Sequence, residues 1–342
     1  MQDSSRRMYE LEYPAPEMKP KDGTTLVVAL QGYADAGQAV DSSAAHLLGS
    51  LENSPVAVFN NDELIDYRSR RPAVRISDHE VVGMDELTLG LYAMRDTVGH
   101  PFLLLAGPEP DMRWNAFTDA VIDLSERFNV ARTLCLYSAP MAVPHTRPLL
   151  VTAHGSSEEI TRRHFRVHSS MTLPGSASLQ LEYVLGSRGS QVAGFTAHVP
   201  HYIAASNYPE ATLKLLRSVE TAGSLSLPLG SLEQDSARMM TLLRDQVDDS
   251  GEIAGMVQSL EQSYDEELES YREDNPEALL PGETGAADGE ALAEEFERFL
   301  ATVDTDDREG PTSSDPAPGS PEATGGSTVE HGEGTDDDGE GS

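Results

Sequence analysis

The chain has 342 residues, a formal net charge of −34 and a mean hydropathy of −0.38. Its length exceeds one typical domain, which predicts one large domain with appendages or two domains. The acidity is concentrated at one end, because residues 231–342 carry 32 acidic and 5 basic side chains, against 26 and 19 in residues 1–230. A negative field of this size disfavours nucleic acid and anionic membrane as partners.

Two further patterns narrow the class of protein. No apolar run reaches the length that spans a bilayer, and no apolar core follows the charged N-terminus, so we expect a soluble, cytoplasmic protein without a signal peptide. The single cysteine, Cys135, lies in the apolar run LCLY, which excludes an intrachain disulfide and predicts a small buried hydrophobe.

The first hundred residues predict strands alternating with helices. Strands are expected at 26–30 and 56–59, with a helix between them that places apolar residues on one side. The segment DELIDYRSRRP follows, and then the short runs AVRIS and EVV predict a small hairpin added to the main sheet. A helix is expected near residues 86–94.

Residues 101–155 carry the strongest pattern. Residues 102–106 are a short, fully apolar run that predicts a strand buried on both faces of a parallel sheet, and residues 133–137 predict the next buried strand. Between them, apolar residues recur at steps of three and four from Trp114 to Phe128, which predicts a helix that Asp111 caps. A loop rich in Pro, His and Arg and a further strand follow.

The remaining elements complete an α/β pattern. A helix is expected from about residue 176, a strand at 192–197 and a helix at 209–223 that Pro209 opens and Gly223 closes. The alternation predicts a three-layer α/β/α core domain over residues 1–228 with a mostly parallel central sheet.

The C-terminal third differs in composition. Residues 229–303 predict an acidic helical extension, in which two apolar stripes joined at 249–251 form a helical hairpin that packs on the core or on another subunit. A linker at 276–289 and a short helix at 291–303 follow. Residues 304–342 hold almost nothing apolar, which predicts a disordered acidic tail.

Candidate site residues gather where the strands of such a sheet end, the place where ligands bind in this fold class. The loops QGYADAG, GPEPD, SAPMAVPHTRP and HVPHY bring eight polar side chains to that edge: Tyr33, Asp35, Glu109, Asp111, His145, Arg147, His198 and His201. If the loops converge, they form a crevice suited to a small anion or to acid–base chemistry. The alternative is that these residues cap helices and tie loops together.

Other motifs are less informative. Arg68, Arg70 and Arg71 form the strongest basic cluster, which is either a solvated face or a site for an anion or a protein partner. His198 and His201 lack a third ligand at diagnostic spacing, so no metal is expected. The turn at Gly32 and Gly37 lacks the Gly-Lys-Ser/Thr of a phosphate loop, so no cofactor is expected.

Several motifs occur together in a familiar order. LEYPAPE, LVVALQGYADAGQAV, DELIDYRSRRP, PFLLLAGPEPDMRW and SAPMAVPHTRPLLVTAHG resemble the actinobacterial branch of the proteasome assembly chaperone 2 family over about residues 8–300. The resemblance implies an α/β/α core of the phosphorylase/hydrolase-like kind that self-associates. It also implies kinship with eukaryotic chaperones of 20S proteasome assembly.

Three hypotheses of function follow. The favoured one is a non-enzymatic assembly chaperone or scaffold that self-associates, as a trimer by analogy with the fold, and that binds proteasome subunits or another protein. The second is a small-molecule binder or enzyme that uses the crevice. The third is a structural oligomer that its acidic tail keeps in solution.

Overall fold

The computed structural model describes residues 8–13, 18, 23–162, 164–166 and 170–275. The linker, short helix and acidic tail expected at 276–289, 291–303 and 304–342 therefore lie outside the described residues. Within the described part, no helix is long and apolar enough to cross a membrane.

The centre of the fold is an eight-stranded sheet with the strand order β1-β3-β6-β7-β2-β8-β10-β9. Its strands are β1 (Tyr9–Leu11), β2 (Thr24–Gln31), β3 (Asn53–Phe59), β6 (Gly90–Arg95), β7 (Pro101–Pro108), β8 (Val130–Met141), β9 (Val151–His154) and β10 (Gln191–Pro200). The middle strands β7, β2, β8 and β10 are parallel, as predicted for the buried apolar runs. The flanking pairs are antiparallel, so the sheet is mixed and the expectation of a mostly parallel sheet was wrong.

Strand β6 accounts for much of that difference, because its residues were predicted to form a helix. Gly90 to Arg95 instead pair with β7 on one side and with β3 on the other. A turn in which the Asp96 carboxylate accepts the N–H groups of Val98 and His100 joins β6 to β7. Such a short turn joins neighbouring strands in antiparallel order, and the sheet then supplies the backbone partners that local propensity does not reveal.

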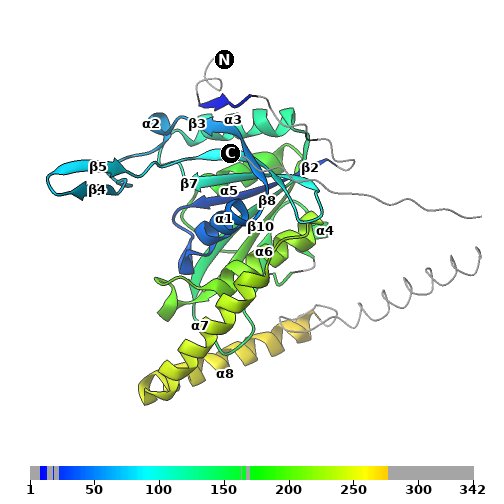
Figure 1. Ribbon diagram of the computed structural model, residues 1–342. Helices are drawn as coiled ribbons and strands as arrows, with labels where there is room; N and C mark the ends of the chain where they lie inside the picture. The colour runs from blue at the N-terminus through cyan, green and yellow to red at the C-terminus, as the bar shows by residue number, and fades with distance from the viewer. Residues whose placement is uncertain (1–7, 14–17, 19–22, 163, 167–169, 276–342) are drawn as a thin grey trace, which may run out of the picture. The chain divides into compact units, whose positions relative to one another are not determined.

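Helices cover both faces of the sheet (Figure 1). Alternate residues of β2 point to opposite sides, so that Val27 joins one apolar cluster and Leu26 the other. The helices are α1 (Ala39–Ser50) and α6 (Pro209–Gly223) in the first cluster, and α3 (Trp114–Arg127) and α5 (Ala177–Ser187) in the second. The single-turn elements are η2 (Ala36–Gln38), α2 (Asn61–Leu64), α4 (Glu158–Thr161) and η3 (His201–Ile203).

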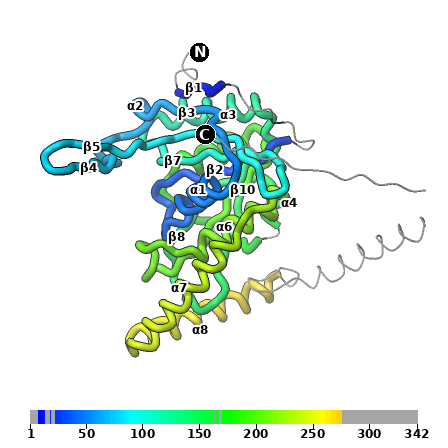
Figure 2. The backbone as a smooth tube through the Cα atoms, in the orientation of Figure 1, coloured from blue at the N-terminus to red at the C-terminus, as the bar shows by residue number. Residues whose placement is uncertain are grey.

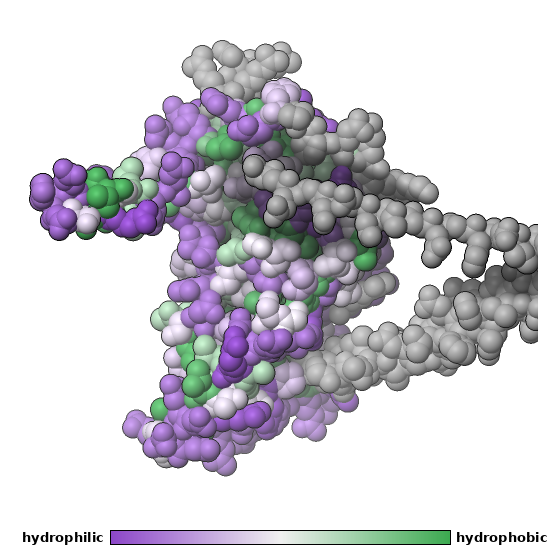
Figure 3. All heavy atoms as spheres, viewed as in Figure 1, coloured by the Kyte–Doolittle hydropathy of each residue, from purple (hydrophilic) through white to green (hydrophobic). Residues whose placement is uncertain are grey.

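The predicted hairpin is present as β4 (Val74–Ser77) and β5 (Glu80–Met84). It forms a separate two-stranded sheet and does not extend the main sheet, which corrects that part of the prediction. Figures 1 and 2 show it reaching away from the body of the fold, and Figure 3 shows apolar side chains on its surface. This hairpin, β4–β5, is the most exposed apolar element of the described chain.

The predicted helical hairpin consists of α7 (Gly230–Asp248) and α8 (Gly251–Asp274), with the Ser250 hydroxyl accepting the Ile253 N–H at the start of α8. Of the two alternatives, packing on the core or on another subunit, the chain shows the first. Tyr264 of α8 is 3% exposed, and its hydroxyl donates to the carbonyl of Pro148 at 2.6 Å. The apolar seam of α8 is thus largely covered within the chain.

Candidate functional site

Asp35, in the loop after β2, serves as a helix cap. Its carboxylate accepts the N–H groups of Val40 (2.7 Å) and Asp41 (3.2 Å) at the start of α1. The Ser138 hydroxyl, at the far end of β8, lies 3.4 Å from the same carboxylate. Burial raises the pKa of Asp35, and the donated hydrogen bonds act against that rise. The contact between Ser138 and Asp35 joins the loop after β2 to the end of β8.

Glu109 links the end of β7 to two other elements. It is 8% exposed, and its carboxylate accepts the N–H of Ala177 at 2.6 Å and that of Tyr33 at 3.4 Å. Ala177 is the first residue of α5, where a carboxylate is favoured by the helix dipole. A Cβ at Gly32 would lie 1.9 Å from Glu109 Oε2, so the turn needs glycine there. The Tyr33 side chain is 73% exposed and faces solvent.

Asp111 was predicted to cap α3, and this was wrong. Its carboxylate accepts the N–H of Asp66 at 2.9 Å and lies 3.3 Å from the Arg70 guanidinium. Arg70 also donates to the carbonyl of Gln31 at 2.7 Å, so the salt bridge ties the segment before the hairpin β4–β5 to the end of β2. Asp111 does not cap α3 because the Leu64 carbonyl accepts the backbone N–H of Asp111 and holds this residue against that segment.

The three arginines of the basic cluster therefore separate into two kinds. Arg70 is half-buried and serves a structural role. Arg68 and Arg71 are exposed, and among the described residues neither side chain has a hydrogen bond or an ion pair. The basic cluster therefore exposes two guanidinium groups, those of Arg68 and Arg71, to solvent.

His145 belongs to a second group of residues, around the loop after β8. It is 3% exposed, and the Tyr202 hydroxyl contacts both its N–H (2.9 Å) and its Nδ1 (2.6 Å). The Tyr202 hydroxyl accepts from the backbone N–H, and the direction of its bond with the ring depends on the tautomer of His145. Burial lowers the pKa of His145, consistent with a neutral ring.

Arg147, two residues further on, holds α8. Its guanidinium donates two hydrogen bonds of 2.8 Å to Asp265 and one of 3.1 Å to Glu261. These bonds to Asp265 raise the pKa of Arg147, so the group is a permanent cation. Arg147 therefore fastens α8 through its salt bridges to Glu261 and Asp265.

The two histidines of the last loop also have separate partners. His198 is 8% exposed and its Nε2 lies 3.2 Å from the Thr152 hydroxyl, while His201 Nδ1 lies 3.4 Å from the carbonyl of Met141. Burial lowers the pKa of His198 to about 4. Among the described residues there is no group of three His, Cys, Asp or Glu side chains placed to hold a metal ion.

The predicted crevice is therefore divided. Asp35, Glu109 and Asp111 fasten the loops near β2 and β7, whereas His145 and Arg147 fasten the loop beneath α8. Within the described residues, no hydrogen bond or ion pair joins the first group to the second. The helix-capping alternative describes Asp35 and Glu109 correctly. These contacts stabilise the fold.

Sequence reasoning missed two polar arrangements. One is a buried chain in which the Tyr137 hydroxyl donates to Glu182 at 2.6 Å, while His154 Nε2 lies 3.2 Å from the other oxygen of that carboxylate. The other is a polar pocket at the opposite, amino-terminal edge of the parallel strands. The sequence holds no signal for either, because each combines residues that are far apart in the chain.

Comparisons with known protein families and solved structures show which family the chain belongs to. A model of the PAC2 family matches residues 29–247. The chain belongs to the PAC2 family. A structure of a Corynebacterium glutamicum protein of unknown function is 56% identical, with a TM-score of 0.76, and covers 78% of this chain and 100% of its own. A Mycobacterium tuberculosis protein of unknown function is 45% identical, with a TM-score of 0.75, and covers 79% of this chain and 92% of its own.

More distant PAC2 relatives carry a functional description. A Mycobacterium tuberculosis protein described as a proteasome-assembly chaperone homologue is 26% identical, with a TM-score of 0.63, and covers 68% of this chain and 100% of its own. Among curated proteins, nothing matches the chain. The predicted resemblance is confirmed, and the relatives of highest identity among these are of unknown function.

Proposed function

We propose that this PAC2 protein is a non-enzymatic scaffold that self-associates through the hairpin β4–β5 and holds proteasome subunits during their assembly. The observation that carries the proposal is an apolar face on that hairpin which nothing in the described chain covers. The printed description of the 26% identical relative supports the choice of proteasome subunits as the class of client.

The pairing register defines the apolar face. Val74 lies opposite Met84, and Ile76 lies opposite Val81. Val74 and Ile76, two apart on β4, project from one side of the ribbon together with the residues directly opposite them. A register shift between Arg75 and Ile76 places Val81 and Met84, three apart on β5, opposite these two residues. These four side chains therefore share one face, and they are 48%, 63%, 68% and 68% exposed. The other two pairs, Arg75 with Gly83 and Ser77 with Glu80, place polar residues on the opposite face.

Such a face is costly to leave in water. An isolated two-stranded ribbon is marginally stable, and burying a Val, Ile or Met side chain completely contributes about 1.5–3 kcal/mol. Because roughly half to two thirds of each side chain is still exposed, covering the face contributes about 1 kcal/mol per residue. The hairpin β4–β5 is therefore more stable in an assembly than in an isolated chain.

A second copy of the chain is the partner that we assign to this face. Each copy carries the same apolar ribbon, and identical patches that meet around a symmetry axis give a closed assembly. The polar side of the ribbon, with Arg75 and Glu80, would then remain in water. By analogy with the fold we expect a trimer, which leaves Arg68 and Arg71, next to the hairpin in sequence, on the rim to meet an acidic client.

Light scattering during gel filtration tests the self-association. The double variant Ile76→Asp, Val81→Asp should reduce the oligomer to monomer, because two buried charges replace apolar contacts on every copy. The matched control is Ser77→Asp on the polar face of the same strand, which should keep the mass. A monomeric wild type at micromolar concentration, or an unchanged mass in the double variant, would refute the hairpin interface.

A second measurement tests the client. Purified 20S α and β subunits are mixed with the full chain, and co-elution is followed on the same column. The proposal expects an assembly intermediate that contains this chain and disappears in the double variant. If the subunits assemble without retaining or responding to the chain, the client assignment fails while the self-association stands.

A further inference from the structure

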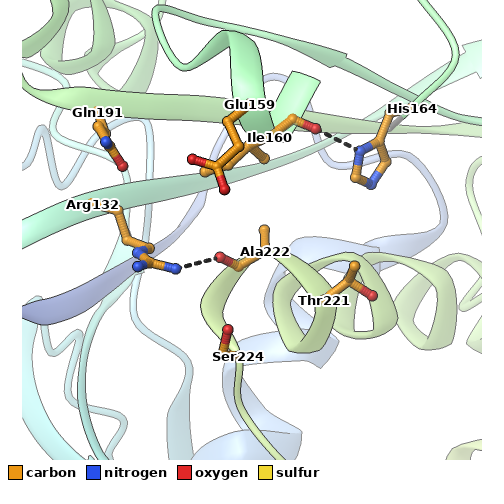
Figure 4. A pocket seen from close by; sticks show the side chains of 8 residues that line it. All are labelled: Arg132, Glu159, Ile160, His164, Gln191, Thr221, Ala222 and Ser224. Atoms are coloured by element: carbon orange, nitrogen blue, oxygen red, sulfur yellow. Dashed lines mark hydrogen bonds between the residues drawn. The ribbon is translucent and has the colours of Figure 1, made fainter. Parts of the chain in front are cut away.

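The polar pocket at the amino-terminal edge of the sheet lies far from the loops discussed so far. Arg132 at the start of β8 and Gln191 at the start of β10 form one side, and α4 and the end of α6 form the others. Figure 4 shows the side chains that surround it. Its volume is about 160 Å³, close to the size of cavity, about 150 Å³, that holds a molecule as large as benzene.

A fixed positive charge lies on one wall. Arg132 is half-buried and donates through Nη1 to the carbonyl of Ala222 at 2.9 Å, in the last turn of α6. A guanidinium carries five N–H donors, and this bond uses one of them. The helix carbonyl therefore orients the group beside the pocket and leaves its remaining donors for another acceptor. A carboxylate is the acceptor that matches a guanidinium in shape and charge.

A negative charge lies across the same space. The Glu159 side chain, from α4, points into the pocket toward the gap between Arg132 and Ala222 (Figure 4). Within the described residues this exposed carboxylate has no hydrogen bond and no ion pair. The end of α6 adds to this negative side, because the carbonyl groups of a last helical turn carry the negative end of the helix dipole.

The remaining lining limits the size of a ligand. His164 is fixed at the rim, since its Nδ1 lies 3.2 Å from the carbonyl of Ile160 and its ring packs on Phe195 at 4.8 Å. Ser224 and Gln191 offer hydroxyl and amide groups. The pocket thus holds one cation and one anion that face each other, with little apolar surface between them.

We propose that this pocket binds a small zwitterion of the α-amino acid class. The ligand carboxylate would accept from Arg132, and its ammonium group would lie against Glu159 and the carbonyl end of α6. A ligand with a carboxylate alone leaves Glu159 unpaired and adds a second negative charge, whereas an amine alone leaves Arg132 unpaired. A nucleotide is much larger than this space. The site is independent of the proposed scaffold function.

Thermal denaturation of the full chain with four small probes tests the proposal. L-alanine and L-serine carry both charges, while propionate lacks the ammonium group and ethylamine lacks the carboxylate. At about 10 mM, the two amino acids should raise the melting temperature and the two single-charge probes should not, because a ligand that binds only the folded state stabilises it by RT ln(1 + [L]/Kd). No shift with either amino acid, or equal shifts with propionate, would overturn the proposal.

A pair of neighbouring variants separates binding from folding. Glu159→Gln removes the pocket carboxylate, and loss of a charged partner should weaken amino-acid binding by about tenfold or more in isothermal titration. Glu158→Gln, the control, removes an exposed carboxylate that pairs with Arg162 at 2.9 Å outside the pocket, and it should bind as the wild type does. Equal affinity in the Glu159→Gln variant would overturn the assignment of the ammonium group.

Discussion

Helix α8 is held on the core by few contacts, and Tyr264 is the central one. Its ring packs in a small apolar cluster with Leu150 and Phe165, and its hydroxyl donates to Pro148 O. Replacing a buried aromatic side chain by alanine costs about 3–5 kcal/mol. In the Tyr264→Ala variant that cost should fall on the docking of α8, because the cluster joins this helix to the core and lies outside the two main clusters.

Hydrogen exchange followed by mass spectrometry measures this directly, because it reports local opening free energies. Amide exchange in residues 251–274 should become at least about 100-fold faster in Tyr264→Ala, while β2 and β8 keep their protection. Tyr264→Phe keeps the ring and loses one hydrogen bond, so about a fivefold increase is expected. Gln262→Ala, an exposed position whose side chain contacts only Glu266 among the described residues, is the control.

The reasoning would be refuted by either of two results. Unchanged exchange in Tyr264→Ala would mean that α8 is fastened elsewhere, for example by Arg147 and Asp265. Faster exchange throughout the sheet would mean that α8 and the core unfold as one unit.

Two further predictions concern pH. His198 has a pKa of about 4 in the folded chain and about 6.5 in the unfolded chain, so the unfolded chain binds a proton at a higher pH. The free energy of unfolding should therefore fall by up to about 3 kcal/mol as the pH drops from 6.5 to 4. Denaturant titrations of the wild type and of His198→Gln at about pH 7 and pH 5 check this. Burial lowers the pKa of His154, but the interaction with Glu182 outweighs burial, so the pKa is raised. The His154–Glu182 pair therefore stabilises the fold at a pH below the unfolded pKa of His154, and this stabilisation is lost as the pH rises through the folded pKa. Glu182→Gln should lower the His154 pKa measured by NMR, and an unchanged titration would contradict the pairing.

The strands that the sequence predicts correctly are those whose burial needs no information from elsewhere. Residues 26–30, 102–106 and 133–137 are apolar on both faces, so they belong in the middle of any sheet that has helices on both sides. The ends of α6 at Pro209 and Gly223 carry their signals locally in the same way. Strand β6 carries no such signal, since its pairing partners are fixed by the short turn that follows it.

The candidate site could be predicted less well, because a side chain's role depends on partners distant in sequence. Arg147 forms a salt bridge with Asp265, which lies 118 residues away in the sequence, and no residue near Arg147 indicates that pairing. Asp111 looked like a helix cap because of its position, but Asp66 and Arg70 compete for its carboxylate. From the sequence alone, the apolar seam of α8 fits packing on the core or on another subunit, and only the structure shows it against the chain's own loop.

The position of β2 in the sheet has a consequence for synthesis on the ribosome. This strand is among the first to be made, yet Leu26 pairs with Leu103 on one side and Thr133 on the other, at separations of 77 and 107 residues. The backbone groups and apolar side chains of β2 therefore stay exposed until both β7 and β8 have been synthesised. Contacts of such long range slow folding and prolong this exposure. A nascent chain arrested between β7 and β8 would display one open edge of β2, the state in which this protein itself most needs protection from aggregation.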